Sequence, residues 1–360
     1  LQHYVYGGQP RRMTKSLARW YALRTICYAN ALTSALRTGK FMDIAALNKF
    51  TPLDASKFRD PLTTGSGETR ASVSLRALQT LWINTGTLCN LTCVNCYIKS
   101  SPTNDRLAYI TTAEVTAYLD EIAADGLGTE EIGFTGGEPF MNPEMIDILK
   151  ATLSRSFRAL VLTNAMRPLA KMQDGLLRLR ESYGDKLVLR VSVDHYDPIQ
   201  HEKERGPRSW EPAIAGLTWL SENGFNINVA GRTFWDEDEA SLRAGYGRLF
   251  SKIGLALDPQ NPVDLVLFPE MDEMADVPEI TTACWGILDV SPDAMMCSSS
   301  RMVVKRRGTD KTIVVPCTLL PYDERFEMGE TLAEAAADVA LNHPHCAKFC
   351  VLGGGACSGG

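Results

Sequence analysis

The middle of the chain alternates between short apolar runs and longer stretches in which apolar residues recur every three or four positions. The short runs are typical of buried strands and the recurring positions of amphipathic helices. We predict strands at residues 80–83, 131–134, 159–163, 187–193, 225–230 and 263–268, separated by helices at about 112–125, 143–156, 169–182, 209–223 and 238–253. Six βα units in series predict an α/β fold, a parallel sheet curved into a partial (β/α)6 barrel. Right-handed crossovers then place the functional loops at the carboxyl ends of the strands.

The two flanks of this alternation follow other patterns. Residues 14–39 have the spacing of one amphipathic helix, and residues 51–74 are rich in Thr, Ser, Pro and Gly, as linkers are. After about residue 275 we predict a β-hairpin from residues 302–305 and 312–315 and a helix over 331–341, before a Cys- and Gly-rich tail. The predicted organisation is a basic helical N-terminal extension with its linker (1–75), a barrel (76–274) and a small C-terminal α+β lobe (275–360).

Composition narrows the class of protein. Of 360 residues, 45% are apolar and 22% charged, which is typical of globular proteins and excludes a disordered or coiled-coil chain. No apolar run approaches the roughly 18 to 20 residues of a membrane span, and no secretory signal opens the chain, so we expect a cytoplasmic protein. Because the first residue is Leu1 rather than Met, we expect the natural gene product to extend upstream.

Charge is unevenly distributed along the chain. Residues 1–53 hold eight Lys or Arg against one acid, Asp43, a local charge of +7. Since the whole chain carries −6, the other 307 residues carry −13. Such a basic arm either recruits an acidic partner or lies across the acidic surface of its own chain, and the second interpretation is the simpler one. No nucleic-acid-binding module is recognisable in the pattern.

Ten cysteines give the chain its chemical character. Three fall within eight residues, from Cys89 to Cys96, and six lie in the last 77 residues. Clustered thiols in a long cytoplasmic chain indicate metal or iron–sulfur ligation before disulfides. Cys27 stands alone and is expected to be a small buried hydrophobic residue.

The first cluster, Cys89-x3-Cys93-x2-Cys96, directly follows the first predicted strand. Three thiolates can hold a [4Fe–4S] cluster and leave one iron without a protein ligand, which indicates chemistry rather than a structural role. The alternative is a zinc knuckle, which needs a fourth ligand. No His occurs between positions 4 and 194, and this weakens the zinc alternative without excluding it.

A second motif, Thr135-Gly136-Gly137-Glu138-Pro139, follows the second predicted strand. Paired glycines let the backbone approach a ligand closely, and a carboxylate accepts hydrogen bonds from an ammonium group. Together with the cysteine motif, this segment closely resembles the radical SAM superfamily, over about residues 79–270. The resemblance implies that S-adenosylmethionine binds the open iron and is reductively cleaved to a 5′-deoxyadenosyl radical, which abstracts a hydrogen atom from a substrate.

The resemblance also assigns roles to single residues. It implies that the cluster is bound by Cys89, Cys93 and Cys96, and that Tyr97 contacts the adenine. It further implies that the methionyl amine is bound by Gly136, Gly137 and Glu138, and that Arg232 pairs with the methionyl carboxylate. Ribose or substrate contacts are implied for Thr163, Asn164, Ser192 and Asp194. Asp194 and Glu270, at strand ends, are candidate acceptors of the proton released when a substrate radical is oxidised. The later assignments compete with ordinary strand-end polar residues, helix caps and surface ion pairs.

The C-terminal cysteines form a third group. Six thiols behind such a core look like the auxiliary-cluster extensions called SPASM or twitch domains, and the resemblance implies at least one auxiliary [4Fe–4S] cluster. The usual SPASM tail reads Cys-x2-Cys-x5-Cys-x3-Cys, whereas this tail reads Cys-x3-Cys-x6-Cys, so the ligand set stays open. The candidates are Cys284, Cys297, Cys317, Cys346, Cys350 and Cys357, and a zinc site is the alternative.

Two substrate classes are compatible with these features. The first choice is a peptide or protein that is crosslinked or oxidised, and the second is a small metabolite in cofactor or natural-product biosynthesis. Residues 1–75 lack the pattern of the winged-helix leader-binding domain that peptide-modifying relatives often carry. A non-catalytic electron-transfer protein is the third hypothesis, although it would not need a pocket for S-adenosylmethionine. A flavodoxin or ferredoxin is the expected reductant.

Overall fold

The structure is a computed structural model and describes residues 52–233, 235, 237–269, 274 and 276–353. The predicted helix at 14–39, Cys27 and the basic arm lie outside these residues. The chain divides into two compact units. The larger unit contains residues 72–272 and 291–340. The smaller unit contains three segments: the first ends at residue 71, the second is 273–290, and the third begins at residue 341. The domain boundaries that we predicted at residues 75 and 274 stay predictions.

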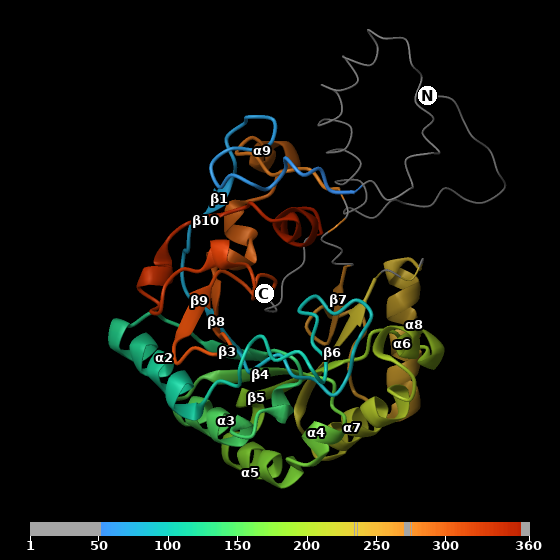
Figure 1. The fold of residues 1–360 in the computed structure, drawn as a ribbon. Coiled ribbons are helices and arrows are strands. Elements are labelled where there is room, and N and C mark those ends of the chain that lie inside the picture. Colours follow the sequence, from blue (N-terminus) through green and yellow to red (C-terminus); the bar gives the residue numbers. More distant parts are fainter. Residues whose placement is uncertain (1–51, 234, 236, 270–273, 275, 354–360) are drawn as a thin grey trace, which may run out of the picture. The chain divides into compact units, whose positions relative to one another are not determined.

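The larger unit contains an eight-stranded sheet (Figure 1) in the order β7-β6-β5-β4-β3-β2-β8-β9. Neighbouring strands from β2 to β7 are parallel and follow one another in chain order, so the predicted α/β architecture is confirmed. The strands are β2 (Thr80–Asn84), β3 (Glu131–Thr135), β4 (Arg158–Thr163), β5 (Leu187–Ser192), β6 (Asn226–Arg232), β7 (Leu265–Phe268), β8 (Ser300–Lys305) and β9 (Thr312–Val315).

Helices connect the parallel strands and lie along the outer side of the curved sheet (Figure 1). The predicted helices are present, with the third divided in two, and the segment after β5 contains a helix that we did not predict, α6. Their bounds are α2 (Thr112–Asp125), α3 (Met145–Ser154), α4 (Arg167–Ala170), α5 (Gln173–Tyr183), α6 (Pro198–Arg205), α7 (Trp210–Glu222) and α8 (Glu239–Ile253). Short 3-10 turns are η2 (Pro139–Met141), η3 (Gly184–Lys186), η4 (Pro292–Ala294), η5 (Met296–Ser298), η6 (Glu324–Phe326) and η7 (Glu334–Ala336).

Local sequence fixes several helix ends. Thr111 caps α2 in a reciprocal capping box with Glu114, and Gly126 ends the helix in the left-handed conformation. Asp238 caps α8 by accepting a hydrogen bond from the Ser241 N–H, and Gly254 ends that helix in the left-handed conformation. These signals are local in sequence, so helix positions were predictable before any tertiary contact was known.

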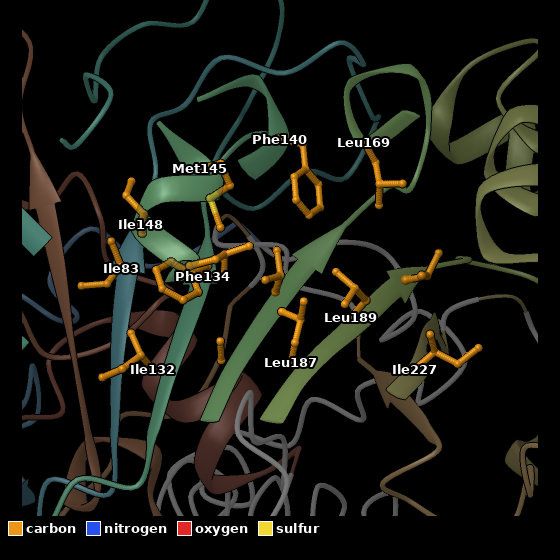
Figure 2. Packing of buried hydrophobic residues seen from close by; sticks show 14 of the residues in the cluster. Ile83, Ile132, Phe134, Phe140, Met145, Ile148, Leu169, Leu187, Leu189 and Ile227 are labelled. Carbon is orange, nitrogen blue, oxygen red and sulfur yellow. The ribbon is translucent and has the colours of Figure 1, made fainter. Parts of the chain in front are cut away.

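The core of the larger unit lies between the sheet and its helices (Figure 2). Side chains two residues apart share one face of a strand, as do Ile132 and Phe134 on β3. Met145 and Ile148 of α3 pack against this face, and all four side chains are fully buried. Burying an apolar side chain of this size contributes about 1.5–3 kcal/mol, so this layer holds the strand ends in place.

The predicted hairpin of β8 and β9 is confirmed, and its place in the sheet is new information. Strand β8 pairs in parallel with β2, with Thr80 opposite Ser300. The predicted helix at 331–341 is wrong. The segment contains the short turn η7 and strand β10 (Val339–Ala340), which pairs with β1 (Ser72–Val73). Backbone carbonyls of this segment accept hydrogen bonds from a buried arginine, Arg301, so tertiary contacts replace the bonds of a helix.

The smaller unit is assembled from segments far apart in sequence. It holds helix α9 (Cys284–Leu288) and the π-type turn η8 (Cys346–Val351). The region expected to be a linker contributes buried Phe58 and Arg70 to this unit. Arg70 pairs with Glu279 at 2.5 Å, and the pair is almost completely buried. A charge pair therefore joins two segments that lie 209 residues apart.

Candidate active site

The loop after β2 carries the three clustered cysteines. Cys89 is buried, and Cys93 and Cys96 are partly exposed. Burial, with smaller contributions from the nearby Glu138, Cys93 and Cys96, raises the pKa of the Cys89 thiol to about 12. Burial likewise raises the pKa of Cys93 to about 11. Since the thiolate is the ligand form, binding iron must displace protons from thiols that the protein alone keeps protonated.

Backbone hydrogen bonds fix the orientation of this cysteine loop. The Leu91 N–H points at the Cys89 sulfur, and the Ser100 N–H at the Cys96 sulfur, each at 3.4 Å. The Cys89 N–H donates to the Ser101 carbonyl at 3.0 Å, which closes the base of the loop. The thiols are thus presented by an ordered backbone.

The glycine motif packs directly on the cysteine loop. The Gly137 N–H donates to the Gly86 carbonyl at 2.7 Å, and the Glu138 N–H donates to the Leu88 carbonyl at 3.1 Å. A Cβ on Gly136 would collide with the Gly86 carbonyl, and Gly136 has a φ of +142°, which disfavours other residues. A Cβ on Gly137 would collide with the Leu88 carbonyl. The paired glycines therefore allow the first and second motifs to touch.

Glu138 joins these loops to the end of β4. Its buried carboxylate accepts hydrogen bonds from the Thr163 hydroxyl and the Asn164 N–H, both at 2.8 Å, and from the Phe140 N–H at 3.2 Å. Burial nevertheless raises the pKa of Glu138 to about 7. The Asn164 side chain in turn donates to Asn90 of the cysteine loop at 2.9 Å. Three separately predicted motifs thus belong to one hydrogen-bonded network.

Helix α6 supports the cysteine loop from another side. The buried Glu204 carboxylate accepts from the Asn95 backbone N–H and from its side-chain amide, both at 2.8 Å. The Val94 N–H donates to the Glu204 carbonyl at 2.8 Å. Arg232, at the end of β6, donates to the Asn95 carbonyl at 2.6 Å and lies 3.7 Å from Glu204. Arg232 therefore contacts the cysteine loop, and its pairing with the methionyl carboxylate stays a prediction.

Asp194 forms a two-pronged ion pair with Arg205, the last residue of α6, at 2.8 and 3.1 Å. Although burial alone would raise it, the pKa of Asp194 is lowered by Arg205 and by Arg232. The charge of Arg205 also opposes the effect of burial on the pKa values of Cys93 and Glu138. The guanidinium is therefore close to both cofactor motifs.

Sequence reasoning missed four residues of this network: Asn90, Asn95, Glu204 and Arg205. A signal for the last two existed. Asp197 caps the helix and is followed by Pro198 at its first position, and Gly206 ends it. This pattern would have placed α6, and with it Glu204 and Arg205, next to the end of β5. The two asparagines lie in an irregular loop and carry no such signal.

The remaining candidates occupy different places. Ser192 ends β5 and Tyr97 follows Cys96, each partly exposed, whereas Glu270 and Cys357 lie outside the described residues. Cys297 and Cys317 are buried in the larger unit, and Cys284, Cys346 and Cys350 belong to the smaller one. Among the described residues, no three His, Cys, Asp or Glu side chains are arranged to hold a single metal ion. A [4Fe–4S] cluster binds each thiolate through a different iron, so its ligands need not converge on one point.

A parallel half-barrel with a three-thiol loop and a glycine motif at its carboxyl edge defines an iron–sulfur class of α/β proteins. Residues 83–240 match the radical SAM superfamily, so this part of the chain is a radical SAM domain.

The chain is similar to several known proteins. It is 30% identical to the antilisterial bacteriocin subtilosin biosynthesis protein AlbA of Bacillus subtilis (strain 168), over 41% of this chain and 31% of AlbA. It is 27% identical to the AdoMet-dependent heme synthase of Methanosarcina barkeri, over 39% of this chain and 38% of the synthase. The chain thus spans about a third of the length of these curated relatives.

Its fold is similar to that of Streptococcus suis SuiB bound to S-adenosylmethionine, with a TM-score of 0.52 and 12% identity over 89% of this chain and 79% of SuiB. Within the described part of the chain, no helix combines the length and apolar character that crossing a membrane requires.

Proposed function

We propose that this protein is a radical SAM enzyme that modifies a peptide or protein by crosslinking or oxidation. When bound, the cluster and S-adenosylmethionine would together supply a 5′-deoxyadenosyl radical that abstracts a substrate hydrogen atom. The observation that carries the proposal is the network that joins the cysteine loop, the glycine motif and the end of β4. An iron–sulfur protein without S-adenosylmethionine would have no need for this second motif beside its thiols.

The residues present fit both groups. Cys89, Cys93 and Cys96 would hold the cluster, because thiolates are the ligands that iron–sulfur clusters use. Gly136, Gly137 and Glu138 would bind the methionyl amine, with Glu138 as the charged acceptor. Tyr97, Thr163, Asn164 and Ser192 line the adjoining loop and strand ends, where we expect adenine and ribose contacts. Arg232 or Arg205 would face the methionyl carboxylate, since both are cations next to the cysteine loop.

The role of the strand-end carboxylates is also part of the proposal. Both Asp194 oxygens accept hydrogen bonds from Arg205, and the pKa of Asp194 is lowered. Asp194 would therefore be a weak base. This geometry favours Asp194 as the residue that orients Arg205. Glu270 remains the candidate acceptor of the substrate proton.

The peptide substrate is supported by two similar proteins. AlbA takes part in biosynthesis of the bacteriocin subtilosin, and SuiB has been observed with the precursor peptide SuiA. A small-molecule substrate is the second candidate, because the heme synthase and the GTP 3′,8-cyclase of Microcystis aeruginosa also match, each at 27% identity. An auxiliary [4Fe–4S] cluster bound by C-terminal cysteines, a flavodoxin or ferredoxin reductant and a cytoplasmic location complete the proposal.

Cys93→Ala tests the core of this proposal. The variant should lose formation of 5′-deoxyadenosine from S-adenosylmethionine under dithionite, because one of three cluster ligands is missing. The barrel should persist, since apolar packing holds it. Chromatography with mass detection measures the product, circular dichroism reports the fold, and Cys27→Ala is the matched control that should keep activity. Product formation by the Cys93 variant at the wild-type rate would refute the cluster assignment.

The substrate class needs a separate experiment. Any short peptide encoded beside the gene is incubated with the reconstituted enzyme, S-adenosylmethionine and dithionite, and its mass is compared before and after. Loss of hydrogen from the peptide supports peptide modification. An unchanged peptide, together with altered small metabolites in cell extracts, supports the second candidate instead.

A further inference from the structure

A buried cation lies outside the network described above. Arg301, the second residue of β8, is only 1% exposed. Its guanidinium donates to four backbone carbonyls: Cys297 at 2.5 Å, Ala335 at 2.7 Å, Ser300 at 2.8 Å and Ala337 at 3.2 Å. Four of the five N–H donors of the guanidinium are thus used, all of them by neutral acceptors.

No carboxylate within the described residues forms an ion pair with Arg301. Placing a charge in the interior is costly unless an opposite charge compensates it. Burial lowers the pKa of Arg301, and three neighbouring groups oppose this effect. Asp338, which is exposed, has the weakest influence of the three. The two stronger influences are the thiols of Cys297 and Cys317.

The hairpin explains why these two cysteines lie near Arg301. Strands β8 and β9 are antiparallel, with Met302 opposite Val315. Cys317 follows the end of β9 by two residues, beyond the last pair of this ladder. Cys297 lies four residues before Arg301 and offers it the carbonyl already described. Both thiols are buried.

We infer that Arg301 is the charge partner of an anionic iron–sulfur centre bound by Cys297 and Cys317, and that it favours the reduced form of that centre. The inference rests on the auxiliary cluster of the proposed function. A thiolate-bound cluster supplies the negative charge that the buried guanidinium otherwise lacks, and each added electron makes the centre more negative. A fixed cation beside it therefore raises the reduction potential. Arg301 is a positioning and tuning residue, since it reaches the cysteine backbone and leaves ligation to the thiols.

The test uses the full chain with Cys89, Cys93 and Cys96 changed to Ala, so that any remaining cluster is auxiliary. Iron, sulfide and zinc are measured after anaerobic reconstitution. In this background, Arg301→Gln removes the charge but keeps amide donors for the carbonyls, and Arg301→Lys keeps the charge. Dithionite titration with redox mediators, followed by electron paramagnetic resonance, gives the one-electron potential of each form.

We expect Arg301→Gln to lower the equilibrium constant for reduction of the cluster by at least about tenfold. For a one-electron couple, this corresponds to a shift of the reduction potential by about 59 mV to more negative values. Arg301→Lys should shift the potential by less than half of this. Equal potentials in all three forms, or equal shifts in both variants, would overturn the inference. If the Gln variant does not fold, Arg301→Met, which retains the apolar stem, takes its place. A parent protein that holds zinc or no metal would instead refute the auxiliary cluster of the proposed function.

Discussion

At the scale of single residues, Glu138 performs more than one task. The sequence indicates an acceptor for an ammonium group, whereas in the structure both carboxylate oxygens already accept hydrogen bonds from protein groups. Each oxygen has two lone pairs, so one further donor can still bind. A Gln at this position would place an NH2 group against a backbone N–H of either Phe140 or Asn164. The charge and the two acceptor oxygens are therefore both required.

Glu138→Ala should retain the visible absorbance of the cluster but bind S-adenosylmethionine more weakly. A charge-assisted hydrogen bond contributes about 1.5–3 kcal/mol, or about 10- to 150-fold in affinity. Anaerobic titration calorimetry measures this change. Thr163→Val is the matched control, because it removes one donor to Glu138 and leaves the carboxylate in place, and it should cost less than about tenfold. If both variants weaken binding equally, Glu138 acts by positioning alone, and if neither does, the amine is bound elsewhere.

At the scale of elements, α6 connects β5 to the cysteine loop. Glu204 and Arg205 at its end reach Asn95 and Asp194, and His201 lies one turn earlier. His201 is fully buried beside the Trp210 ring, and neither ring nitrogen has a hydrogen-bond partner in the part of the chain that the structure describes. Burial first, and then Arg205, lower the pKa of His201 to about 4, against the opposing charges of Asp194 and Glu202. The packing of α6 therefore requires a neutral imidazole.

This requirement predicts a pH dependence of stability. An unfolded His titrates near 6.5, so between pH 6.5 and 4 the unfolded chain takes up a proton that the folded chain excludes. Stability is then retained above pH 6.5 and falls as the pH drops toward 4, by up to about 3 kcal/mol. His201→Phe should reduce this pH dependence, measured as the change in urea midpoint between pH 7.5 and 5. The same change in the variant as in wild type would contradict the prediction.

At the scale of the whole molecule, the smaller unit depends on contacts between distant segments. Glu279 accepts hydrogen bonds from Arg70 at 2.5 Å and from the backbone N–H groups of Phe58 and Gly65, both at 2.6 Å. Its side chain is 6% exposed, and that of Arg70 is completely buried. Because no other acidic side chain pairs with Arg70 among the described residues, losing this carboxylate would leave a buried cation.

Glu279→Ala should therefore destabilise the smaller unit by about 3–5 kcal/mol, the usual cost of breaking a buried pair by removing one partner. Limited proteolysis within residues 52–71 and urea unfolding report the effect. Arg76→Ala breaks the exposed pair of Arg76 with Asp293 and should cost less than about 1 kcal/mol. Equal resistance of the two variants to protease would show that apolar contacts alone assemble this unit.

The sequence by itself determined the parts of this protein that depend on neighbouring residues. Apolar periodicity located the six parallel strands and the helices between them, because it acts over a few residues. Caps such as Thr111 and Gly126 are equally local, although the periodicity argument did not use them. Motif spacing likewise identified the thiol loop and the glycine segment. Only the tertiary structure decided which groups meet across long sequence separations. It placed β8 beside β2, replaced the expected helix at 331–341 with carbonyls that bind Arg301, and directed Glu138 to Asn164. Those choices depend on burial and charge compensation between distant segments, and no local pattern records them.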